Sequence, residues 1–512
     1  MLVKTFGSAI IGVNAITITV EVDISRGVMF HMVGLPDSAV KESHQRIEAA
    51  LSNNGYKIPG KQITINMAPA DIRKEGSSYD LTIATGILAA SEQIQSQQVG
   101  KYVIMGELSL DGGLQPIKGA LPIAIQARKE NFEGFILPRQ NAREAAIVNK
   151  LTVYGVDNIK QVIDFFNGKA KLEETIINTR DEFFSCLNKY EFDFSDVKGQ
   201  ENIKRALEIA AAGGHNVILI GPPGSGKTML AKRLPSILPP LNLNEALETT
   251  KIHSVAGKMH KDTSLISIRP YRSPHHTISD AGLVGGGTFP QPGEISMAHN
   301  GVLFLDELPE FKRSVLEVMR QPMEDRVVTI SRARISVEYP ASFMLVAAMN
   351  PCPCGYYNHP EQDCVCAPGI VQKYLNKISG PLLDRIDIHV EVVPVPFREL
   401  ADLREGEKSE KIRQRVEQAR NIQNDRYQEF EGMHCNAQMS TKQLRKICRI
   451  NEAGHQILKN AMEKLSLSAR AYDRILKVSR TIADLDNSPD INAEHLAEAI
   501  HYRSLDRENW GK

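Results

Sequence analysis

The sequence predicts an α/β protein with a three-layer core, in which helices cover both faces of a parallel sheet. An α+β domain precedes this core and a helical domain follows it. Short apolar runs at residues 217–220, 301–305 and 343–348 are separated by helical stretches and loops, which is typical of buried parallel strands. Residues 1–170 alternate strand-like and helix-like stretches, whereas the pattern after Pro396 is helical throughout.

A chain of 512 residues is too long for a single hydrophobic core, so we expect several domains. The expected segments are 1–170 for the α+β domain, 171–193 for a linker with a short helix, 194–395 for the sheet core and 396–512 for the helical domain. The linker is polar and charged, and its sequence contains no buried-strand pattern.

Periodicity predicts individual elements within these segments. Two-residue alternation predicts strands at Ala15–Val22 and Gln62–Met67. Helical spacing predicts helices at Ser38–Leu51, Gly119–Lys129 and Ile203–Ala211.

The helical domain contains one clear amphipathic pattern. Ile475, Val478, Ile482 and Leu485 are spaced by three, four and three residues, which places them on one helix face. Asn492 is expected to cap the last helix of the sequence.

Charge and hydropathy exclude several classes of protein. Sixty-one Lys plus Arg balance sixty-one Asp plus Glu, so a nucleic-acid partner would need a local basic surface. No run of about 18 apolar residues occurs, so no membrane partner is expected. The N-terminus lacks a basic stretch followed by an apolar segment, so we expect a cytoplasmic protein without a secretory signal.

A glycine-rich motif lies between the first apolar strand of the core and a helix. It consists of Gly221, Pro222, Pro223, Gly224, Ser225, Gly226, Lys227 and Thr228. Backbone N–H groups of such a loop converge on phosphates, and the helix N-terminus adds partial positive charge. Lys227 is expected to reach the β- and γ-phosphates of ATP, and the Thr228 hydroxyl to ligate Mg²⁺. The alternative, a glycine-rich turn without a ligand, leaves the strand–loop–helix context unexplained.

Polar side chains end the other two apolar strands. Asp306 and Glu307 follow residues 301–305 as in a Walker B segment. Asp306 is expected to hold Mg²⁺ through water, and Glu307 to polarise the attacking water. Asn350 ends the third strand, where its amide could orient the same water. An Asn before a Pro can also mark a simple turn, and this alternative stays open.

Two arginines are expected to complete the reacting centre. Phosphoryl transfer gains from a cation that a neighbouring element brings to the γ-phosphate. Arg385 follows Asp384, and Arg470 lies in the helical domain. A local salt bridge is the simpler interpretation of Arg385, and an exposed surface arginine that of Arg470.

Four of the seven cysteines crowd into fifteen residues. They are Cys352, Cys354, Cys364 and Cys366, in two Cys-x-Cys pairs around a polar loop. Four thiolates at this spacing could close a structural, tetrahedral Zn²⁺ site just beyond Asn350. The alternative is four reduced thiols on a loop. His275 and His276 have no second ligand pair nearby and are expected to make hydrogen bonds instead.

Together these motifs resemble those of the magnesium-chelatase-like AAA+ ATPases of the YifB/ComM family. The resemblance spans essentially the whole chain, with matching stretches at Gly221–Thr228, Arg272–Ile278, Gly285–Gly287, Leu303–Glu307, Asn350–Gly355 and Ser379–Asp387. It implies a P-loop AAA+ core with a helical lid, assembled into a hexameric ring with nucleotide at the subunit interfaces. It also implies that Arg385 is a trans-acting arginine finger and Arg470 the sensor arginine of the lid.

The same resemblance implies a hairpin ahead of Asn350, because the family belongs to the clade of the MCM helicases. The hairpin would be Arg326–Tyr339, with Arg332 and Arg334 near its tip as candidate DNA contacts in a central pore. As bare chemistry this segment is a strand pair with a basic turn, and a solvated turn is the alternative.

Residues 1–170 resemble the Lon-protease-like domain of this family. Lon-type proteases use a Ser–Lys dyad, and Ser78 matches the serine position. Leu121 takes the lysine position, whereas Lys118 lies three residues earlier. Because leucine cannot transfer a proton, no peptidase activity is expected, and the domain is expected to dock DNA or organise the ring.

The resemblance therefore implies a motor that acts on single-stranded or branched DNA in recombination or DNA uptake. Two alternatives share the ATP site, namely remodelling of protein substrates and the ATPase subunit of a metal chelatase. The Lon-like domain argues against the chelatase. Zero net charge argues against DNA unless a ring gathers basic residues from each subunit into one pore.

Overall fold

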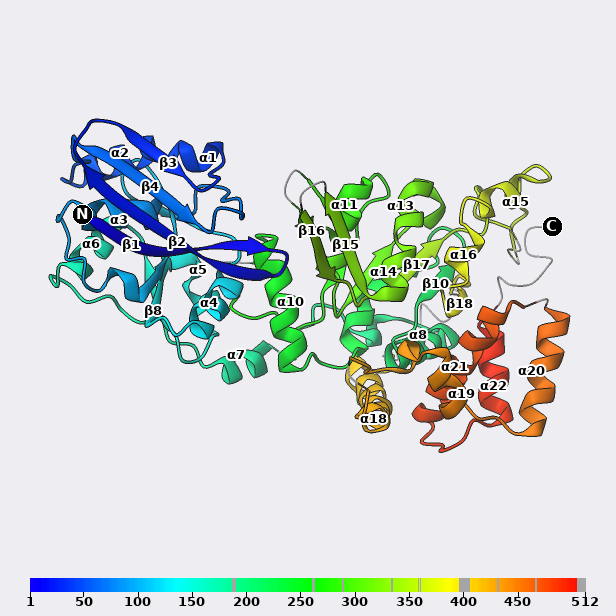
Figure 1. The fold of residues 1–512 in the computed structure, drawn as a ribbon. Helices are drawn as coiled ribbons and strands as arrows, with labels where there is room; N and C mark the ends of the chain where they lie inside the picture. Colours follow the sequence, from blue (N-terminus) through cyan, green and yellow to red (C-terminus); the bar gives the residue numbers. More distant parts are fainter. Residues whose placement is uncertain are drawn as a thin grey trace.

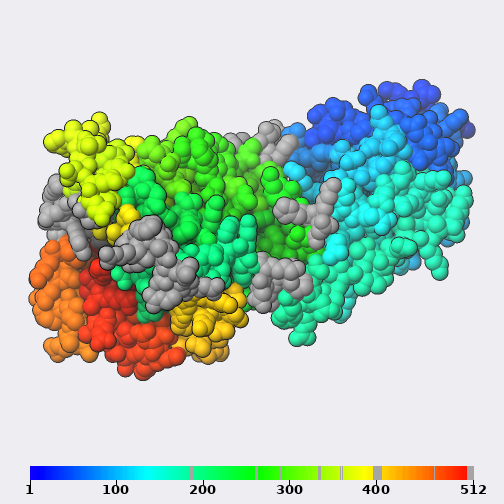
Figure 2. All heavy atoms as spheres, turned by 180° about the vertical axis from the view of Figure 1, so that it is seen from behind, coloured from blue at the N-terminus to red at the C-terminus, as the bar shows by residue number. Residues whose placement is uncertain are grey.

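The computed structural model describes residues 1–186, 190–259, 263–287, 290–332, 335–357, 359, 361–395, 406–430, 432–465 and 467–503. The N-terminal residues form one lobe, and the sheet core and C-terminal helices form a larger one (Figure 1, Figure 2). No helix within these ranges is long and apolar enough to span a membrane.

The first domain is a mixed sheet of seven strands packed against helices, in the order β3-β4-β2-β1-β5-β8-β9. Its strands are β1 (Leu2–Ile11), β2 (Asn14–Ser25), β3 (Phe30–Val33), β4 (Gln62–Ala68), β5 (Tyr102–Ile104), β8 (Gly134–Pro138) and β9 (Thr152–Val156), with a small hairpin of β6 (Glu107–Leu108) and β7 (Leu114–Gln115). Its helices are α1 (Ser38–Lys41), α2 (Ser43–Asn53), α3 (Asp80–Ala90), α4 (Ala120–Lys129), α5 (Arg139–Ala145) and α6 (Ile159–Phe166). Strands β1, β2 and β4 pair antiparallel, whereas β5, β8 and β9 run parallel.

Two-residue alternation predicted β2 and β4 correctly. Val20 on β2 and Met67 opposite it on β4 are both fully buried. The single helix expected over Ser38–Leu51 was wrong in one respect, since the structure has two helices there. The chain makes a tighter turn at Glu42, whose carbonyl oxygen accepts a hydrogen bond from the Gln45 N–H.

The sheet of the larger lobe has five parallel strands in the order β11-β14-β17-β10-β18. Its strands are β10 (Val217–Ile220), β11 (Tyr271–Arg272), β14 (Val302–Leu305), β17 (Met344–Met349) and β18 (Ile388–Glu391). The helices around it are α8 (Glu201–Gly213), α9 (Lys227–Arg233), α10 (Leu243–Val255), α11 (Asp280–Val284), α12 (Glu294–Met297), α13 (Arg313–Val318), α14 (Arg320–Asp325), α15 (Ile370–Leu375) and α16 (Gly380–Leu383). Val217 and Leu219 belong to one hydrophobic cluster and Ile218 and Ile220 to another, so both faces of the sheet are covered and the predicted three layers are confirmed.

The predicted apolar runs correspond to β10, β14 and β17, in which every residue is buried. The sequence did not predict β18, because Asp387 and His389 interrupt its apolar pattern. The structure buries both of these side chains, and Asp387 pairs with His215 at 3.2 Å. This partner precedes β10, far away in the sequence.

The C-terminal lid is helical, as predicted. It consists of α18 (Ser409–Tyr427), α19 (Thr441–Ile447), α20 (Glu452–Lys464), α21 (Ala469–Leu485) and α22 (Ala493–His501). Ile475, Val478 and Ile482 of the predicted apolar face are buried, and Asn492 is the N-cap of α22.

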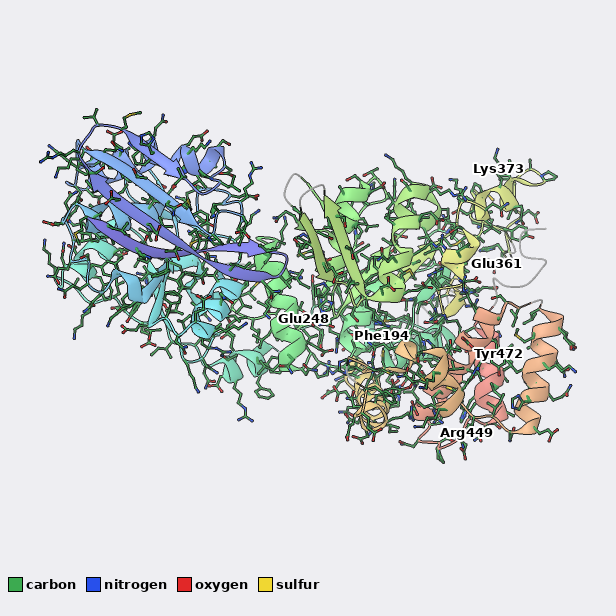
Figure 3. All side chains as sticks on the ribbon, in the orientation of Figure 1. Phe194, Glu248, Glu361, Lys373, Arg449 and Tyr472 are labelled. Atoms are coloured by element: carbon green, nitrogen blue, oxygen red, sulfur yellow. The ribbon has the colours of Figure 1, made fainter. Side chains whose placement is uncertain are left out.

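Helix α10 of the sheet core docks the first domain. Leu241, Ala246 and Leu265, at and around α10, belong to the hydrophobic core of the first domain, and α10 packs against α4. The Gly119 N–H donates a hydrogen bond to the Ser254 carbonyl oxygen at 3.1 Å. Figure 3 labels Glu248 on this helix, between the two lobes. The linker contains the helix α7 (Thr179–Cys186), and the expected domain boundaries stay predictions.

Candidate nucleotide-binding site

The phosphate loop, Gly221–Thr228, joins β10 to α9 at the carboxyl edge of the sheet. Gly226 caps α9 with a left-handed backbone (φ 89°). Gly221 has no room for a side chain, because a Cβ there would lie 2.3 Å from the Val392 carbonyl oxygen. The segment therefore folds into a tight loop that leads into a helix N-terminus, an arrangement that binds phosphate.

Lys227 is the first residue of α9, and its ammonium group is buried in the loop. It donates hydrogen bonds to the carbonyl oxygens of Gly221 (2.7 Å) and Pro222 (2.8 Å), and to Asn350 Oδ1 (3.2 Å). Burial lowers the pKa of Lys227, and the nearby Asp306 carboxylate opposes this shift. A phosphate beside the ammonium would likewise favour its charged form.

Thr228 and Asp306 meet although they lie in different strand–loop segments. The Thr228 hydroxyl donates a hydrogen bond to Asp306 Oδ2 at 2.7 Å. The carboxyl ends of β10 and β14 share one edge of the parallel sheet, with only β17 between them. Both groups offer the hard oxygen donors that Mg²⁺ prefers, so the two predicted Mg²⁺ ligands fit this metal.

Glu307 follows Asp306 with an unusual backbone. Its φ of 52° lies in the left-handed region, which non-glycine residues adopt uncommonly. Its carboxylate is more than half exposed, and Oε2 lies 3.3 Å from His276 Nδ1. The sequence predicted hydrogen bonds for His276 but did not identify Glu307 as its partner. His275 instead contacts the Thr277 hydroxyl at 2.9 Å.

Gln200 is a site residue that the sequence did not identify. Its side-chain amide donates to the Ser225 carbonyl oxygen in the phosphate loop (3.0 Å) and to the Val393 carbonyl oxygen after β18 (3.2 Å). Gln200 thus ties the loop to the edge strand of the sheet. Gly199 before α8 is a turn signal in the sequence, but such a signal does not reveal this role.

Arg385 and Arg470 lie near the amino ends of the strands, whereas the phosphate loop lies at their carboxyl ends. Asn216, which precedes β10, donates a side-chain hydrogen bond to the Arg385 carbonyl oxygen at 3.0 Å. The length of β10, about 13 Å, therefore separates Arg385 from the loop. The buried Arg385 side chain pairs with Glu324 at 2.5 Å, and the exposed Arg470 pairs with Asp384 at 3.5 Å. The structure thus brings neither guanidinium to the phosphate loop of its own subunit.

The two Cys-x-Cys pairs come together in space. The four sulfur atoms of Cys352, Cys354, Cys364 and Cys366 lie within 4.8 Å of one another. The Cys352 sulfur lies 3.2 Å from that of Cys354 and 3.7 Å from that of Cys364. Cys352 is buried, and the other three are partly exposed. Such a cluster of soft donors suits Zn²⁺.

The predicted hairpin ahead of Asn350 is present. Strands β15 (Val327–Arg332) and β16 (Ile335–Pro340) pair antiparallel, with Val328 and Ile330 buried against the core. The Arg332 side chain and the whole of Arg334 lie outside the described residues, so their DNA contacts stay predictions.

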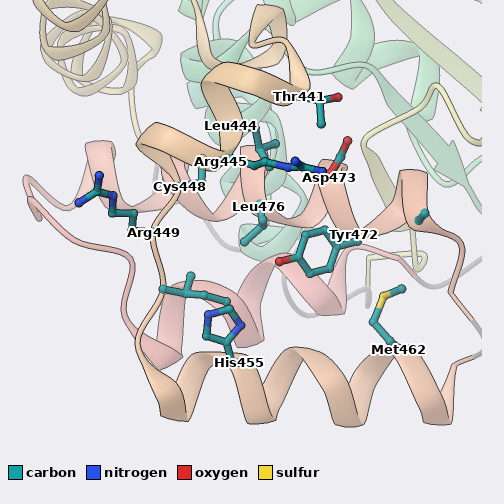
Figure 4. Close-up of a pocket in the computed structure, with 12 residues that line it drawn as sticks. Thr441, Leu444, Arg445, Cys448, Arg449, His455, Met462, Tyr472, Asp473 and Leu476 are labelled. Atoms are coloured by element: carbon teal, nitrogen blue, oxygen red, sulfur yellow. The ribbon is translucent and has the colours of Figure 1, made fainter.

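A separate cleft of about 860 Å³ opens in the lid between α19, α20 and α21 (Figure 4). Arg445, Arg449, His455, Tyr472 and Asp473 are among its lining residues. All of its lining comes from residues 441–476, so this cleft is distinct from the nucleotide site.

The three residues that the alignment with a Ser–Lys dyad singles out make separate contacts. Leu121 is fully buried, and its N–H donates to Glu144 Oε1 at 2.9 Å. The exposed Lys118 side chain lies along Gly257 of the following domain. The Ser78 carbonyl oxygen accepts a hydrogen bond from the Gly106 N–H at 2.8 Å.

Three family descriptions match this chain in succession. "Subunit ChlI of Mg-chelatase" matches residues 20–141, "Magnesium chelatase, subunit ChlI" matches residues 193–400, and "Magnesium chelatase, subunit ChlI C-terminal" matches residues 406–503.

Two relatives are similar to this chain over nearly its full length. Competence protein ComM of Haemophilus influenzae is 44% identical over 504 residues, which cover 98% of this chain and 97% of that protein. The protein YifB of Escherichia coli is 45% identical over 503 residues, which cover 98% of this chain and 96% of that protein. Lon protease 2 of Bacillus subtilis is 34% identical over 159 residues, 28% of this chain and 27% of that protein.

Proposed function

The chain belongs to the magnesium-chelatase-like AAA+ ATPases of the YifB/ComM family, and on this premise we propose that it is an ATP-driven ring motor acting on DNA. Its work would be helicase or branch-migration activity in recombination or DNA uptake. The observation that carries this proposal is the similarity to a competence protein over 98% of this chain, because competence is the uptake of DNA.

The chemistry of the proposal rests on the phosphate loop and the two strand ends beside it. Lys227 would contact the β- and γ-phosphates of ATP. Thr228 and Asp306, already 2.7 Å apart, would hold Mg²⁺, which when bound neutralises phosphate charge. Glu307 would polarise the attacking water, and the Asn350 amide would orient that water.

Assembly would complete the site. Arg385 and Arg470 lie at the end of the sheet remote from their own phosphate loop, which supports a role at the nucleotide of a neighbouring subunit. In the proposed hexamer, Arg385 would exchange Glu324 for the γ-phosphate across the interface, and Arg470 would approach the same phosphate from the lid. A monomer would bind ATP and barely hydrolyse it.

DNA would contact the β15–β16 hairpin in the centre of the ring. Six copies of Arg332 and Arg334 would line the pore with positive charge despite the zero net charge of the chain. The first domain, in which Leu121 takes the aligned lysine position, would dock DNA or organise the ring.

The four cysteines would hold a structural Zn²⁺. In a tetrahedral site with Zn–S bonds of about 2.3 Å, the sulfur atoms lie about 3.8 Å apart. The observed separations of 3.2, 3.7 and 3.5 Å among Cys352, Cys354 and Cys364 differ little from this value.

One experiment distinguishes the proposed motor from its two alternatives. The ATPase rate is measured with no addition, with single-stranded DNA, with a four-way DNA junction and with an unfolded protein. Stimulation by DNA is expected, and stimulation by unfolded protein alone would support a protein-remodelling factor instead. The family descriptions name a magnesium chelatase subunit, so a porphyrin with its chelatase partners is the fifth condition.

A further inference from the structure

We propose that the segment with the four cysteines, residues 352–366 (the cysteine knuckle), packs against the phosphate loop and holds it in place as a clasp. Metal binding by the knuckle would then control ATP binding. This inference rests on the zinc site proposed above. It adds a regulatory link between that site and the nucleotide, through direct contacts between the two segments.

The first contact is between the Gly355 backbone and the Pro223 ring. Gly355 turns the chain just after the first pair of cysteines, with φ 88° and its N–H bonded to the Cys352 carbonyl oxygen at 3.0 Å. A Cβ at Gly355 would lie 2.4 Å from Pro223 Cδ in the phosphate loop. The knuckle backbone therefore packs against the loop so closely that no side chain fits between them.

The second contact is through Asn350, two residues before the first cysteine. Its Oδ1 accepts the hydrogen bond from Lys227 Nζ. The Gly221 N–H also bonds to the Met349 carbonyl oxygen at 3.2 Å. The segment that enters the knuckle thus touches both ends of the phosphate loop.

The second pair of cysteines lies further along the chain, with Cys364 ten residues after Cys354. Cys352 and Cys354 belong to the part that touches the loop, whereas Cys364 and Cys366 lie on the way to α15. Figure 3 labels Glu361 and Lys373, which flank the second pair in sequence, at the end of the core away from the first domain. A metal bound by all four sulfur atoms would link the two parts, and its loss would free residues 352–355 from that link.

Loss of the metal should therefore weaken ATP binding without unfolding the sheet. The buried Lys227 ammonium and the Pro223 ring would lose the surface that positions them. Misplacement of such groups by about 1 Å can lower activity by about 100-fold. We expect ATP affinity to fall by about tenfold, because binding depends less steeply on position than hydrolysis does.

The test uses the full-length protein expressed with added zinc. Metal content is measured by elemental analysis, and affinity by titration with a fluorescent ATP analogue and Mg²⁺. The double variant Cys364→Ser/Cys366→Ser removes two ligands that are partly exposed. Val365→Ser is the matched control, because Val365 lies between these cysteines and is 83% exposed. About one zinc per chain is expected in the wild type and the control but not in the double variant, which should also bind ATP about tenfold more weakly.

The variant Gly355→Ala tests the contact with the phosphate loop separately from metal binding. This variant keeps all four cysteines but places a methyl group against Pro223, so it should retain zinc and still lose ATP affinity.

If the double variant does not fold, wild-type protein is stripped of metal with a chelator and then reloaded with zinc. ATP affinity should fall on stripping and recover on reloading. No zinc in the wild type, with all four thiols free to react, would overturn the metal site. Zinc loss without a change in ATP affinity would overturn the clasp. Neither result depends on whether DNA stimulates the ATPase.

Discussion

The Lys227 ammonium of the phosphate loop donates a hydrogen bond to the Asn350 side chain at 3.2 Å. The two residues are 123 positions apart in the sequence. They meet because β10 and β17 are adjacent parallel strands whose carboxyl ends share one edge of the sheet. This contact links the group proposed to bind phosphate to the group proposed to orient water.

Asn350→Ala should lower kcat by about 100-fold, because a positioned donor acts mainly on the transition state. ATP affinity should fall by at most about tenfold, the effect expected from loss of the contact with Lys227. Steady-state kinetics and nucleotide titration measure the two effects separately. Asn376→Ala, at an exposed asparagine after α15, is the control. An unchanged kcat in Asn350→Ala would leave this residue as a simple turn before Pro351.

Glu307→Gln should bind ATP normally and lose nearly all hydrolysis, because an amide cannot accept a proton from water. The ATP-bound ring should then persist, which size-exclusion chromatography with ATP and Mg²⁺ detects. Glu310→Gln is a matched control three residues away, where the carboxylate pairs with Lys377 at 3.1 Å. Sustained turnover by Glu307→Gln would assign the catalytic carboxylate elsewhere.

The sequence alone predicted three strands in which every residue is buried. Strands β10, β14 and β17 are apolar throughout, so a local pattern was sufficient. Strand β18 is also buried, but it includes His389 and follows Asp387 directly. These polar residues can be buried there only because the surrounding fold accommodates them, and Asp387 in particular has His215 as its partner. A single sequence does not show which distant residue will be the partner.

The nucleotide site shows the same difference between residues with a local sequence signal and residues whose role depends on distant partners. The phosphate loop, Asp306 and Asn350 were predicted because each follows a recognisable strand, and parallel strands bring their ends together. Gln200 and His276 were not assigned their roles, since those depend on contacts with Ser225 and Glu307 that form only in the folded chain.

Protonation of His253 should destabilise the protein in mild acid. This buried imidazole lies 3.0 Å from the Met297 carbonyl oxygen, and burial lowers its pKa from 6.5 to about 4. The folded-state pKa lies below the unfolded value, so the stabilisation is complete above pH 6.5 and is lost as the pH falls towards 4. The loss amounts to about 3 kcal/mol over that range.

The measurement is Tm by differential scanning fluorimetry between pH 7 and 5. His253→Gln cannot titrate, so its Tm should fall less over this range than that of the wild type. His455→Gln, at an exposed position on α20, should follow the wild type. If the Tm of His253→Gln falls as much between pH 7 and 5 as that of the wild type, protonation of His253 is not the cause of the lost stability.

The double variant Arg332→Ala/Arg334→Ala should bind DNA more weakly and with a weaker dependence on salt. Each lost phosphate contact should reduce the slope of log affinity against log salt by about 1. Fluorescence anisotropy with labelled single-stranded DNA at several salt concentrations measures the slope. Lys459→Ala/Lys464→Ala removes the same charge from exposed positions on α20 and should leave the slope unchanged. Equal slopes for both variants would place the DNA elsewhere on the ring.

Mixing two inactive variants should restore part of the ATPase activity. Lys227→Ala removes phosphate binding, and Arg385→Ala removes the cation proposed to act on the neighbour. Each alone should be nearly inactive.

In a mixed ring, some interfaces join an intact Lys227 to an intact Arg385. The Lys227 comes from an Arg385→Ala subunit and the Arg385 from a Lys227→Ala subunit. At equal concentrations of the two variants, roughly a quarter of the interfaces have this composition. Arg385 lies at the far end of the sheet from its own phosphate loop, so the proposed interface would join the two groups. Activity of the mixture is measured against each variant at the same total concentration. Mixing Lys227→Ala with Glu307→Gln is the control, because both changes fall on the same side of the interface and an intact site never forms. A mixture of Lys227→Ala and Arg385→Ala with no more activity than this control would show that Arg385 does not act across the interface.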